Sequence, residues 1–462
     1  MPASLPKADA SVAGVSAGLE PYVPSAEQPW DYFRALHLLR RTRFGVRRGE
    51  VLPALAMPPA DLVDQIIDEA LALDVPGIRE DVDIDAMHLI WTEQMLDWGL
   101  RERMAFFWSG HFVTEQRFYV RGKYITDYLQ RLRTHALGNF RELTRSIGIS
   151  PAMLIYLDGA KNVKGRPNEN YARELLELFT VGEGLYTQQD IVDLSRALTG
   201  WGLDYERREA RFYPYLHDDG EKTILGRTGR FGYDEAVDLI FEERPQEIAR
   251  FVCAKLYRHF VYAHPKQPVL DALAEAFVAS GFEIAPLLRM ILKSAHFFDE
   301  AFIGAKIKSP VEFVLSVFHE GYQLRIVNDK PFLANTFFGL LRLEQVLFNP
   351  PSVSGWPEHR DWMSSSSVSS RVEIGSYFAS LTRVDVDPLW NDLTDPWDPY
   401  LTAQELTEHV FGRPLSEEEV YRYTLQLLGN VPDYEWDPTA LNSLRLRLFM
   451  QNLLQRPEAH LT

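Results

Sequence analysis

Apolar residues recur at intervals of three and four positions over most of this 462-residue chain. The spacing runs through residues 29–42, 59–72, 84–108 and 122–147, and it places the apolar side chains of each stretch on one face of an α-helix. Windows this long are the most dependable pattern that a sequence offers. We therefore predict a mainly α fold with a large multi-helix globular core.

Composition divides the chain into three segments. Residues 1–28 are rich in Ala, Ser and Pro, which predicts a disordered N-terminal tail. Residues 29–385 carry the long helical patterns and predict the core. Residues 386–462 begin in an Asp- and Pro-rich junction and predict a C-terminal helical segment that packs on the core. Because the tail lacks the apolar region of a secretory signal, we expect a cytoplasmic protein.

Two segments interrupt the helical pattern. Between residues 203 and 232 short alternating pieces flank the sequence DDG, which predicts a small β-hairpin or an ordered loop inserted in the core. Residues 349–370, NPPSVSGWPEHRDWMSSSSVSS, combine prolines, tryptophans and a serine run. Proline and glycine exclude regular structure there, while Trp356 and Trp362 argue against a plain linker.

Charge and cysteine content exclude several classes of protein. Lys and Arg number 48 against 65 Asp and Glu, a net charge of −17, whereas binding to nucleic acid or anionic lipid calls for a basic surface. Cys253 is the only cysteine, which excludes an intrachain disulfide, a four-cysteine zinc site and a CxxC pair. No apolar run of about 18 residues predicts a membrane span. Nucleotide-binding, GxSxG, HExxH and CxxCH fingerprints are absent, so we expect no haem, iron–sulfur or nucleotide cofactor.

The first candidate segment is NENYARELLELFT, residues 168–180. At 100° per residue, Asn170, Arg173 and Glu174 fall in one arc about 100° wide, opposite an apolar face. Two interpretations are open. The arc is either a solvated helix face with pairs such as Glu169–Arg173, or a buried cluster that binds metal or moves protons.

Two further helical segments carry histidines and cations. FWSGHF contains His111 at the end of an aromatic helix, where a histidine is either a satisfied structural residue or a rigidly held ligand or base. RFVCAKLYRHFV places Lys255, Arg258 and His259 in a basic stripe. That stripe either pairs with the acidic face of residues 168–177 or clamps an anionic group of a substrate.

The last candidate segment is LHDDGEKTILG. His217, Asp218 and Lys222 gather a base, an acid and a cation on one turn, and loops carry function more often than helices do. The alternative is a hairpin turn whose Asp218 and Lys222 are solvated. The remaining histidines, His359 among them, are too scattered in the sequence to suggest a site.

Taken in order, these blocks resemble a known family. FWSGHF, NENYARELLELFT, HDDGEKTILG, KSPVEFV and PPSVSGWP are similar to the bacterial family called domain of unknown function 1800, over about residues 38–365. The family has no agreed reaction, so the resemblance implies no catalytic residue. The positions that match the family pattern are Asn168, Glu169, Asn170, Arg173, Glu174, Glu177, His217, Asp218, Lys222, Arg258, His259 and Trp356.

The resemblance also bears on partners and compartment. Genes of the family often lie beside genes of a second uncharacterised family that resembles sulfatases. By analogy, the resemblance implies that this chain has a sulfatase-like protein partner. Many relatives look exported, with twin-arginine or Sec leaders. A periplasmic location is therefore the alternative to the cytoplasmic one.

Three hypotheses of function follow. The first is an enzyme, a hydrolase or transferase that acts on an anionic or polar substrate in a polar pocket, with a divalent metal ion as the cofactor considered. The second is a non-catalytic binding or assembly partner of the sulfatase-like protein, docking through the loop 349–362. The third is carbohydrate binding on Trp356 and Trp362. For the enzyme, the expected catalytic residues are His217, Asp218, Glu174 and His111, and the expected anion-binding residues are Lys222, Arg258, His259, Arg173 and Asn170.

Overall fold

A computed structural model describes residues 18–75, 77, 82, 84–118, 122–322, 330–381, 386–429, 431–438 and 442–462. Within these ranges the chain forms twenty-one α-helices and two small antiparallel hairpins. The predicted mainly α fold with a small β insertion is confirmed. Residues 1–17 of the predicted N-terminal tail lie outside the described residues.

The N-terminal helices are α1 (Tyr32–Thr42), α2 (Arg48–Ala54), α3 (Pro59–Ala72) and α4 (Ile84–Asp97). The middle of the chain forms α5 (Gly99–His111), α6 (Gly122–His135), α7 (Phe140–Gly148), α8 (Pro151–Tyr156), α9 (Asn170–Glu174), α10 (Gln188–Ala197), α11 (Tyr233–Glu243), α12 (Pro245–Phe260), α13 (Gln267–Ala279) and α14 (Ile284–Lys293). The C-terminal third forms α15 (Pro310–Glu320), α16 (Lys330–Arg342), α17 (Ser365–Leu381), α18 (Val386–Asp392), α19 (Pro399–Phe411), α20 (Glu417–Leu428) and α21 (Asn442–Leu454). The strands are β1 (Trp201–Asp204), β2 (Glu209–Phe212), β3 (Lys222–Ile224) and β4 (Arg227–Gly229).

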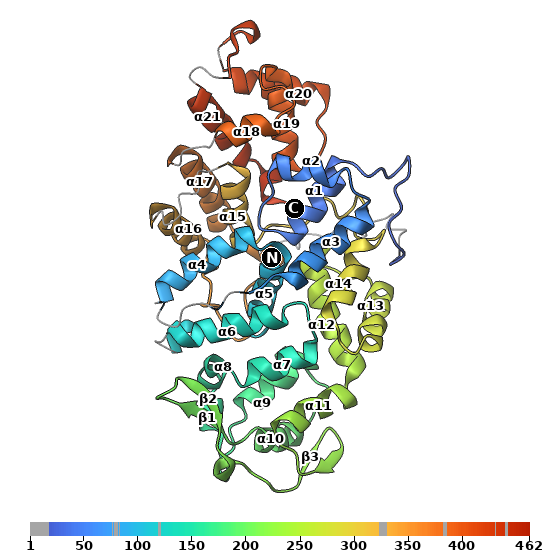
Figure 1. Cartoon of the computed structure of the whole chain (residues 1–462), viewed down its shortest axis with the longest axis vertical. Coiled ribbons are helices and arrows are strands. Elements are labelled where there is room, and N and C mark those ends of the chain that lie inside the picture. The colour runs from blue at the N-terminus through green and yellow to red at the C-terminus, as the bar shows by residue number, and fades with distance from the viewer. Residues whose placement is uncertain are drawn as a thin grey trace, which may run out of the picture.

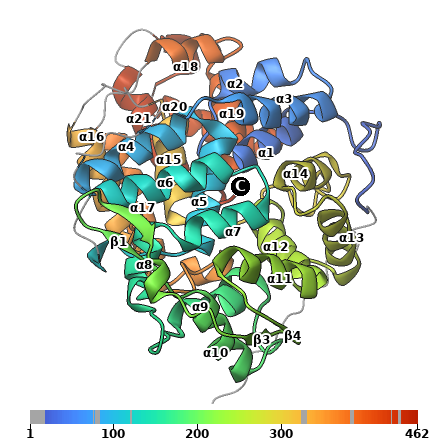
Figure 2. The same ribbon diagram turned by 60° about the horizontal axis from the view of Figure 1, so that its bottom comes forward.

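The N-terminal and C-terminal helices lie side by side in the same half of the molecule (Figure 1). In Figure 1 the N-terminal helices α1 and α2 lie beside the C-terminal helices α18 and α19, while the hairpins and α10 form the opposite end. Helices α5, α6 and α7 lie between these ends, and each packs on the next (Figure 2). The centre of the molecule is therefore built around α5.

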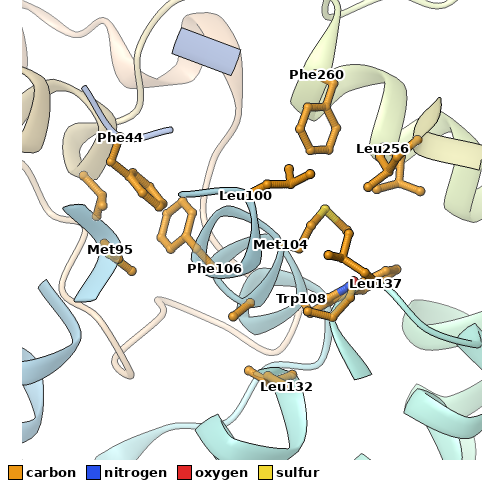
Figure 3. Packing of buried hydrophobic residues seen from close by; sticks show 14 of the residues in the cluster. Phe44, Met95, Leu100, Met104, Phe106, Trp108, Leu132, Leu137, Leu256 and Phe260 are labelled. Atoms are coloured by element: carbon orange, nitrogen blue, oxygen red, sulfur yellow. The ribbon is translucent and has the colours of Figure 1, made fainter. Parts of the chain in front are cut away.

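Helix α5 is apolar on several sides, which makes it a buried core helix. Figure 3 shows its side chains reaching toward neighbours on different elements. Phe106 meets Phe44 with ring centroids 5.5 Å apart. The α5 residues in this packing are Leu100, Met104, Phe106 and Trp108, and their neighbours include Met95, Leu132, Leu137, Leu256 and Phe260.

The same helix buries charged side chains, and each of them has a partner. Glu102 and Arg133 of α6 are both fully buried, and Arg133 Nε lies 2.6 Å from Glu102 Oε1. Trp91 Nε1 donates to the other oxygen of Glu102 at 2.7 Å. Arg101 donates to the carbonyl oxygens of Ala70 at 2.8 Å and Arg133 at 2.6 Å. Because an unpaired buried charge is destabilising, these pairs fix how α4 and α6 sit on α5.

Two long helical stretches predicted as single patterns are each divided in the structure. Residues 84–108 form α4 and α5, which meet at Gly99 with a left-handed φ of +50°. Residues 122–147 form α6 and α7, because Asn139 caps α7 by accepting a hydrogen bond from Arg141 N at 3.0 Å. Periodicity alone does not register such breaks, since the apolar spacing continues across them.

The irregular segments also differ in detail from the sequence pattern. Each hairpin has its own turn, and DDG lies in the connection between β2 and β3 rather than at a hairpin turn. The serine run, predicted to be irregular, begins helix α17 at Ser365. Ser364 Oγ accepts a hydrogen bond from Ser367 N at 3.1 Å, which helps to start that helix.

The C-terminal helices are tied to the N-terminal ones by buried polar contacts. Tyr32 OH lies 2.6 Å from His409 Nδ1, and Arg48 Nη2 lies 2.6 Å from Glu405 Oε1. The division of the chain at residues 385 and 386 stays a prediction. No helix in the part of the chain that the structure describes has both the length and the apolar character needed to span a bilayer.

We predict that Arg133→Met lowers the free energy of unfolding by about 3–5 kcal/mol, because it leaves the Glu102 carboxylate buried without its cation. Urea denaturation followed by circular dichroism measures the change. Arg250→Met, which removes an exposed ion pair with Asp271, is the matched control and should cost less than about 1 kcal/mol. Equal losses in the two variants would contradict this account of α5.

Candidate functional site

A cleft of about 150 Å³ lies beside the C-terminal end of α5. Its walls come from four parts of the chain that are distant in sequence: α5, the last turns of α12, residues 306–312 at the start of α15, and the loop 354–362. Each wall contains one of the sequence blocks singled out above: FWSGHF, RFVCAKLYRHFV, KSPVEFV and PPSVSGWP. The fold therefore brings these blocks to one place.

Two glycines allow the loop 354–362 to touch α5. Gly355 has a left-handed φ of +93°, and a Cβ on it would lie 2.5 Å from the carbonyl oxygen of Gly110. The ring of Trp356 covers Gly110 and stacks on Phe106, with ring centroids 6.4 Å apart. This close contact sets Trp356 in the wall of the cleft.

His111 and Lys255 form a hydrogen-bonded pair on one side of the cleft. Lys255 Nζ lies 3.1 Å from His111 Nδ1, and because an ammonium can only donate, Nδ1 is the acceptor. His111 Nε2 then carries the proton and donates it to the carbonyl oxygen of Phe179 at 2.9 Å. Lys255 Nζ also donates to the carbonyl oxygen of Leu178 at 3.2 Å.

Those two carbonyls belong to a π-helical turn, Leu175–Thr180, which follows α9. The last carbonyl oxygens of a helix have no hydrogen-bond donor within the helix. A cation or a hydrogen-bond donor near that end therefore stabilises the helix. Lys255 and His111 thus have a structural role as caps. Short π-helical turns are also frequent at functional sites, and this one holds both side chains at the cleft.

Burial changes the acid–base character of this pair. Burial and the charge of Lys255 hold the pKa of His111 well below its ordinary value. Burial also lowers the pKa of Lys255 to about 8, with Arg258 adding to the effect and Glu358 opposing it. Near neutral pH the pair therefore contains a neutral imidazole and an amine that can lose its proton.

Three buried ring nitrogens in the cleft wall have no hydrogen-bond partner among the described residues. They are His259 Nε2, His359 Nε2 and Trp356 Nε1. Leaving a buried polar atom unpaired costs about 1–3 kcal/mol. Partnerless buried atoms also lie elsewhere in the described residues, Trp30 Nε1 and Arg371 Nε among them, but these three nitrogens line one cleft. Burial, together with Arg103 and Lys306, holds the pKa of His259 well below its ordinary value.

The far wall of the cleft is a buried ion-pair cluster. The Glu312 carboxylate forms ion pairs with Arg103 of α5 and with Lys306, whose Nζ lies 2.7 Å from Glu312 Oε1. Burial alone would raise the pKa of Glu312, but Arg103 and Lys306 hold it well below its ordinary value. At the mouth of the cleft Arg258 Nε lies 3.0 Å from Glu358 Oε2. The cleft is lined by Lys255, Arg258 and Lys306 and by two carboxylates, which favours an anion while the lysines are charged. Burial lowers the pKa of Lys306 to about 7 and that of Lys255 to about 8, so this excess of positive charge falls as the pH rises through that range.

Of the nine residues predicted from sequence, three line the cleft: His111, Arg258 and His259. The basic stripe does not pair with the acidic face of residues 168–177, because Arg258 is bound by Glu358 of the loop instead. That expectation is wrong. The segment 168–180 contributes to the site through its backbone carbonyls rather than through its acidic side chains.

The predicted residues of the DDG connection lie away from the cleft, in a network of their own. Asp218 Oδ2 lies 2.8 Å from Arg196 Nε, and His217 Nδ1 lies 3.0 Å from the carbonyl oxygen of Thr199. Lys222 is buried, not solvated, and donates to the carbonyl oxygens of Asp218 and Gly220. These contacts fold the connection onto α10.

The predicted polar face of α9 lies largely at the surface. Asn170 is exposed, and Arg173 Nη2 lies 3.2 Å from Glu169 and 3.1 Å from Gln188. Burial and the neighbouring Glu177 raise the pKa of Glu174. None of Asn170, Arg173 and Glu174 lines the cleft.

Sequence reasoning did not single out several residues of the cleft. Lys306 and Glu358 carried no recognisable signal, and His359 was set aside because it is isolated in the sequence. A signal did exist for Glu312, since Ser309 and Glu312 form a capping box at the start of α15. Among the residues described, no group of three or more His, Cys, Asp or Glu side chains is arranged to hold a metal ion.

Comparison with known proteins gives one match. The model of a family described as "Protein of unknown function (DUF1800)" matches residues 37–459. No curated protein and no solved structure matches the chain.

We predict that Gly355→Ala lowers the free energy of unfolding by about 2–4 kcal/mol, because backbone strain is joined by a clash with Gly110 O. Gly184→Ala is the control, since Gly184 has a φ of +79° with open space around it. The control should lose only about 1–2 kcal/mol. Thermal and urea unfolding measure both, and similar losses would contradict the close contact.

We predict a pH-dependent difference in stability between the wild type and Lys255→Met. Folded Lys255 releases its proton near pH 8, whereas its ordinary value is 10.5. The unfolded chain thus binds more protons within this interval, so the contribution of Lys255 to stability rises with pH there, by about 3 kcal/mol in all. Urea unfolding across the interval measures it, with exposed Lys161→Met as control. Parallel curves for wild type and Lys255→Met would refute the prediction.

Proposed function

Because the chain belongs to the DUF1800 family, whose description assigns no activity, we propose its function from the cleft itself. The protein is an enzyme that binds a small anionic substrate beside Lys255 and hydrolyses or transfers a group on it. The substrate is small because the cleft offers only about 150 Å³. Larger substrates would have to extend past Arg258 and Glu358 at the mouth.

One observation carries this proposal. His259 Nε2, His359 Nε2 and Trp356 Nε1 are buried, lack partners among the described residues and line the same cleft. Other buried polar atoms of the described residues also lack partners, whereas these three nitrogens converge on one cleft that a ligand can enter. The indole nitrogen can only donate, so it calls for an acceptor such as an oxygen of an anion.

The chemistry of the cleft residues assigns them two roles, anion binding and proton transfer. Trp356, His259 and Arg258 bind the acidic group of the substrate, because they supply donors and positive charge. The Lys255–His111 pair takes up and returns a proton, since its two nitrogens share a hydrogen bond and Lys255 titrates near pH 8. Of the residues predicted from sequence, the proposal uses His111, Arg258 and His259 and leaves the other six outside it.

The two non-catalytic hypotheses rely on the tryptophans of the loop 349–362. Trp362 is only 7% exposed, and Trp356 stacks on Phe106 inside the cleft wall. Docking to a sulfatase-like partner or stacking on a sugar calls for exposed aromatic faces. The packing of both rings therefore favours the enzyme over these alternatives.

Titration calorimetry with inorganic sulfate and inorganic phosphate tests the proposal. Trp356→Phe keeps the ring but removes its N–H, so we expect affinity to fall about tenfold, as for the loss of one charge-assisted hydrogen bond. Trp397→Phe, at a tryptophan that is 59% exposed, is the matched control and should bind as the wild type does. Absence of binding to the folded wild type, or equal affinity in both variants, would overturn the proposal.

A further inference from the structure

We propose that Lys255 is the nucleophile of the cleft and that it forms a reversible imine with the carbonyl carbon of a small keto or aldehyde acid. This inference rests on the proposed function, since the anion-binding groups of the same cleft would seat the acid group. It goes further in naming both the substrate class and the bond that forms.

The surroundings of Lys255 differ from those of Lys306 and Lys308, which both lie against carboxylates. Lys222 also has no carboxylate ion pair among the described residues, but it lies outside the cleft. The Nζ of Lys255 contacts His111 Nδ1 and the carbonyl oxygen of Leu178, and it lies 4.5 Å above the ring of Phe251. In the described part of the chain no carboxylate forms an ion pair with it. Lys306, in contrast, is bound by Glu312 at 2.7 Å. An amine without a carboxylate partner is free to act as a nucleophile.

The other nucleophilic side chains near the cleft are engaged or remote. Ser309 Oγ accepts a hydrogen bond from Glu312 N at 3.3 Å as the cap of α15, and Ser354 Oγ lies 2.7 Å from Ser352 Oγ. Cys253 is buried outside the cleft, and burial raises the pKa of its thiol. Neither serine hydroxyl contacts a histidine, so neither has the base that activates such a nucleophile.

The proton balance of the step closes within the site. The neutral amine of Lys255 attacks the carbonyl carbon, so a C–N bond forms and the C=O π bond breaks. The attacking nitrogen passes one proton to His111 Nδ1, which lies 3.1 Å away, and His111 returns that proton to the carbonyl oxygen to give a carbinolamine. The second proton of the nitrogen follows the same route to the hydroxyl, the C–O bond breaks as water leaves, and the neutral imine remains. The step consumes no oxidant and no reductant.

The substrate class follows from the spacing along α12. Lys255 and His259 are one helical turn apart, so their side chains leave the same face of the helix about 6 Å apart at Cβ. A carbonyl next to a carboxylate is short enough for its carbon to meet Lys255 while its carboxylate faces His259 on the same side of the helix. An imine withdraws electrons from the neighbouring carbon, so this chemistry suits transfer of a carbon group rather than simple hydrolysis. Since burial lowers the pKa of Lys255 to about 8, part of the amine is neutral at neutral pH.

Reductive trapping on the wild-type protein tests the inference. The protein is incubated with pyruvate or glyoxylate and sodium cyanoborohydride, and with acetone or acetaldehyde as neutral carbonyl compounds of similar size. Peptide mass spectrometry then locates the adduct. We expect the adduct on Lys255 to form at least several-fold faster than on Lys161, whose side chain is 70% exposed, and faster with the acids than with the neutral compounds.

Each outcome decides between the two proposals. An adduct on Lys161 at the same rate, on Lys306 instead, or no adduct on Lys255 overturns the inference. If sulfate still binds the cleft in that case, the proposed function stands without it, and if sulfate does not bind, both fail. Lys255→Arg keeps the cation that caps the π-helical turn but lacks the reactive amine. In this variant the adduct should disappear while the protein stays folded.

Discussion

A buried helix that carries charges is the constraint on which the rest of this structure depends. Helix α5 lies at the centre with apolar neighbours on several sides (Figure 3), yet it also buries Glu102, Arg103 and His111. Each of these groups needs a partner, because an isolated charge or polar atom in a core is strongly destabilising. The partners come from α6, α15 and the π-helical turn Leu175–Thr180. Pairing the buried polar groups of α5 therefore fixes the positions of α6, α15 and the π-helical turn around it.

The cleft arises where this pairing is incomplete. Toward its N-terminal end α5 is closed off by the Glu102–Arg133 pair. Toward its C-terminal end the loop 354–362 closes over Gly110, but the ring nitrogens of His259, His359 and Trp356 are left without protein partners among the described residues. Arg103 and Lys306 stabilise the Glu312 carboxylate, and Arg258 lies at the mouth of the cleft, in a chain whose net charge is −17. Cationic side chains beside partnerless donors attract small anions.

Sequence alone predicted the helical fold and the family, because apolar periodicity and motif order are local signals. It did not predict the break at Gly99, since the apolar spacing continues through it. For the site it selected His111, Arg258 and His259 but could not group them, because no local spacing links α5 to α12. The acidic side chains of residues 168–177 stood out in the sequence. In the structure the segment 168–180 contributes to the cleft through the backbone carbonyls of Leu178 and Phe179. A pattern of side chains gives no information about such backbone contacts. The pairing of Lys306 with Glu312 and the place of His359 depend on tertiary contacts alone.

The most direct test of the central claim is a crystal structure of the protein soaked in selenate, an analogue of sulfate, with anomalous data at the selenium edge. The account predicts a selenium peak in the cleft, with selenate oxygens within hydrogen-bond distance, about 3 Å, of Trp356 Nε1 and His259 Nε2. A peak only at the Asp218–Lys222 connection, or none in the cleft of an intact protein, would contradict it.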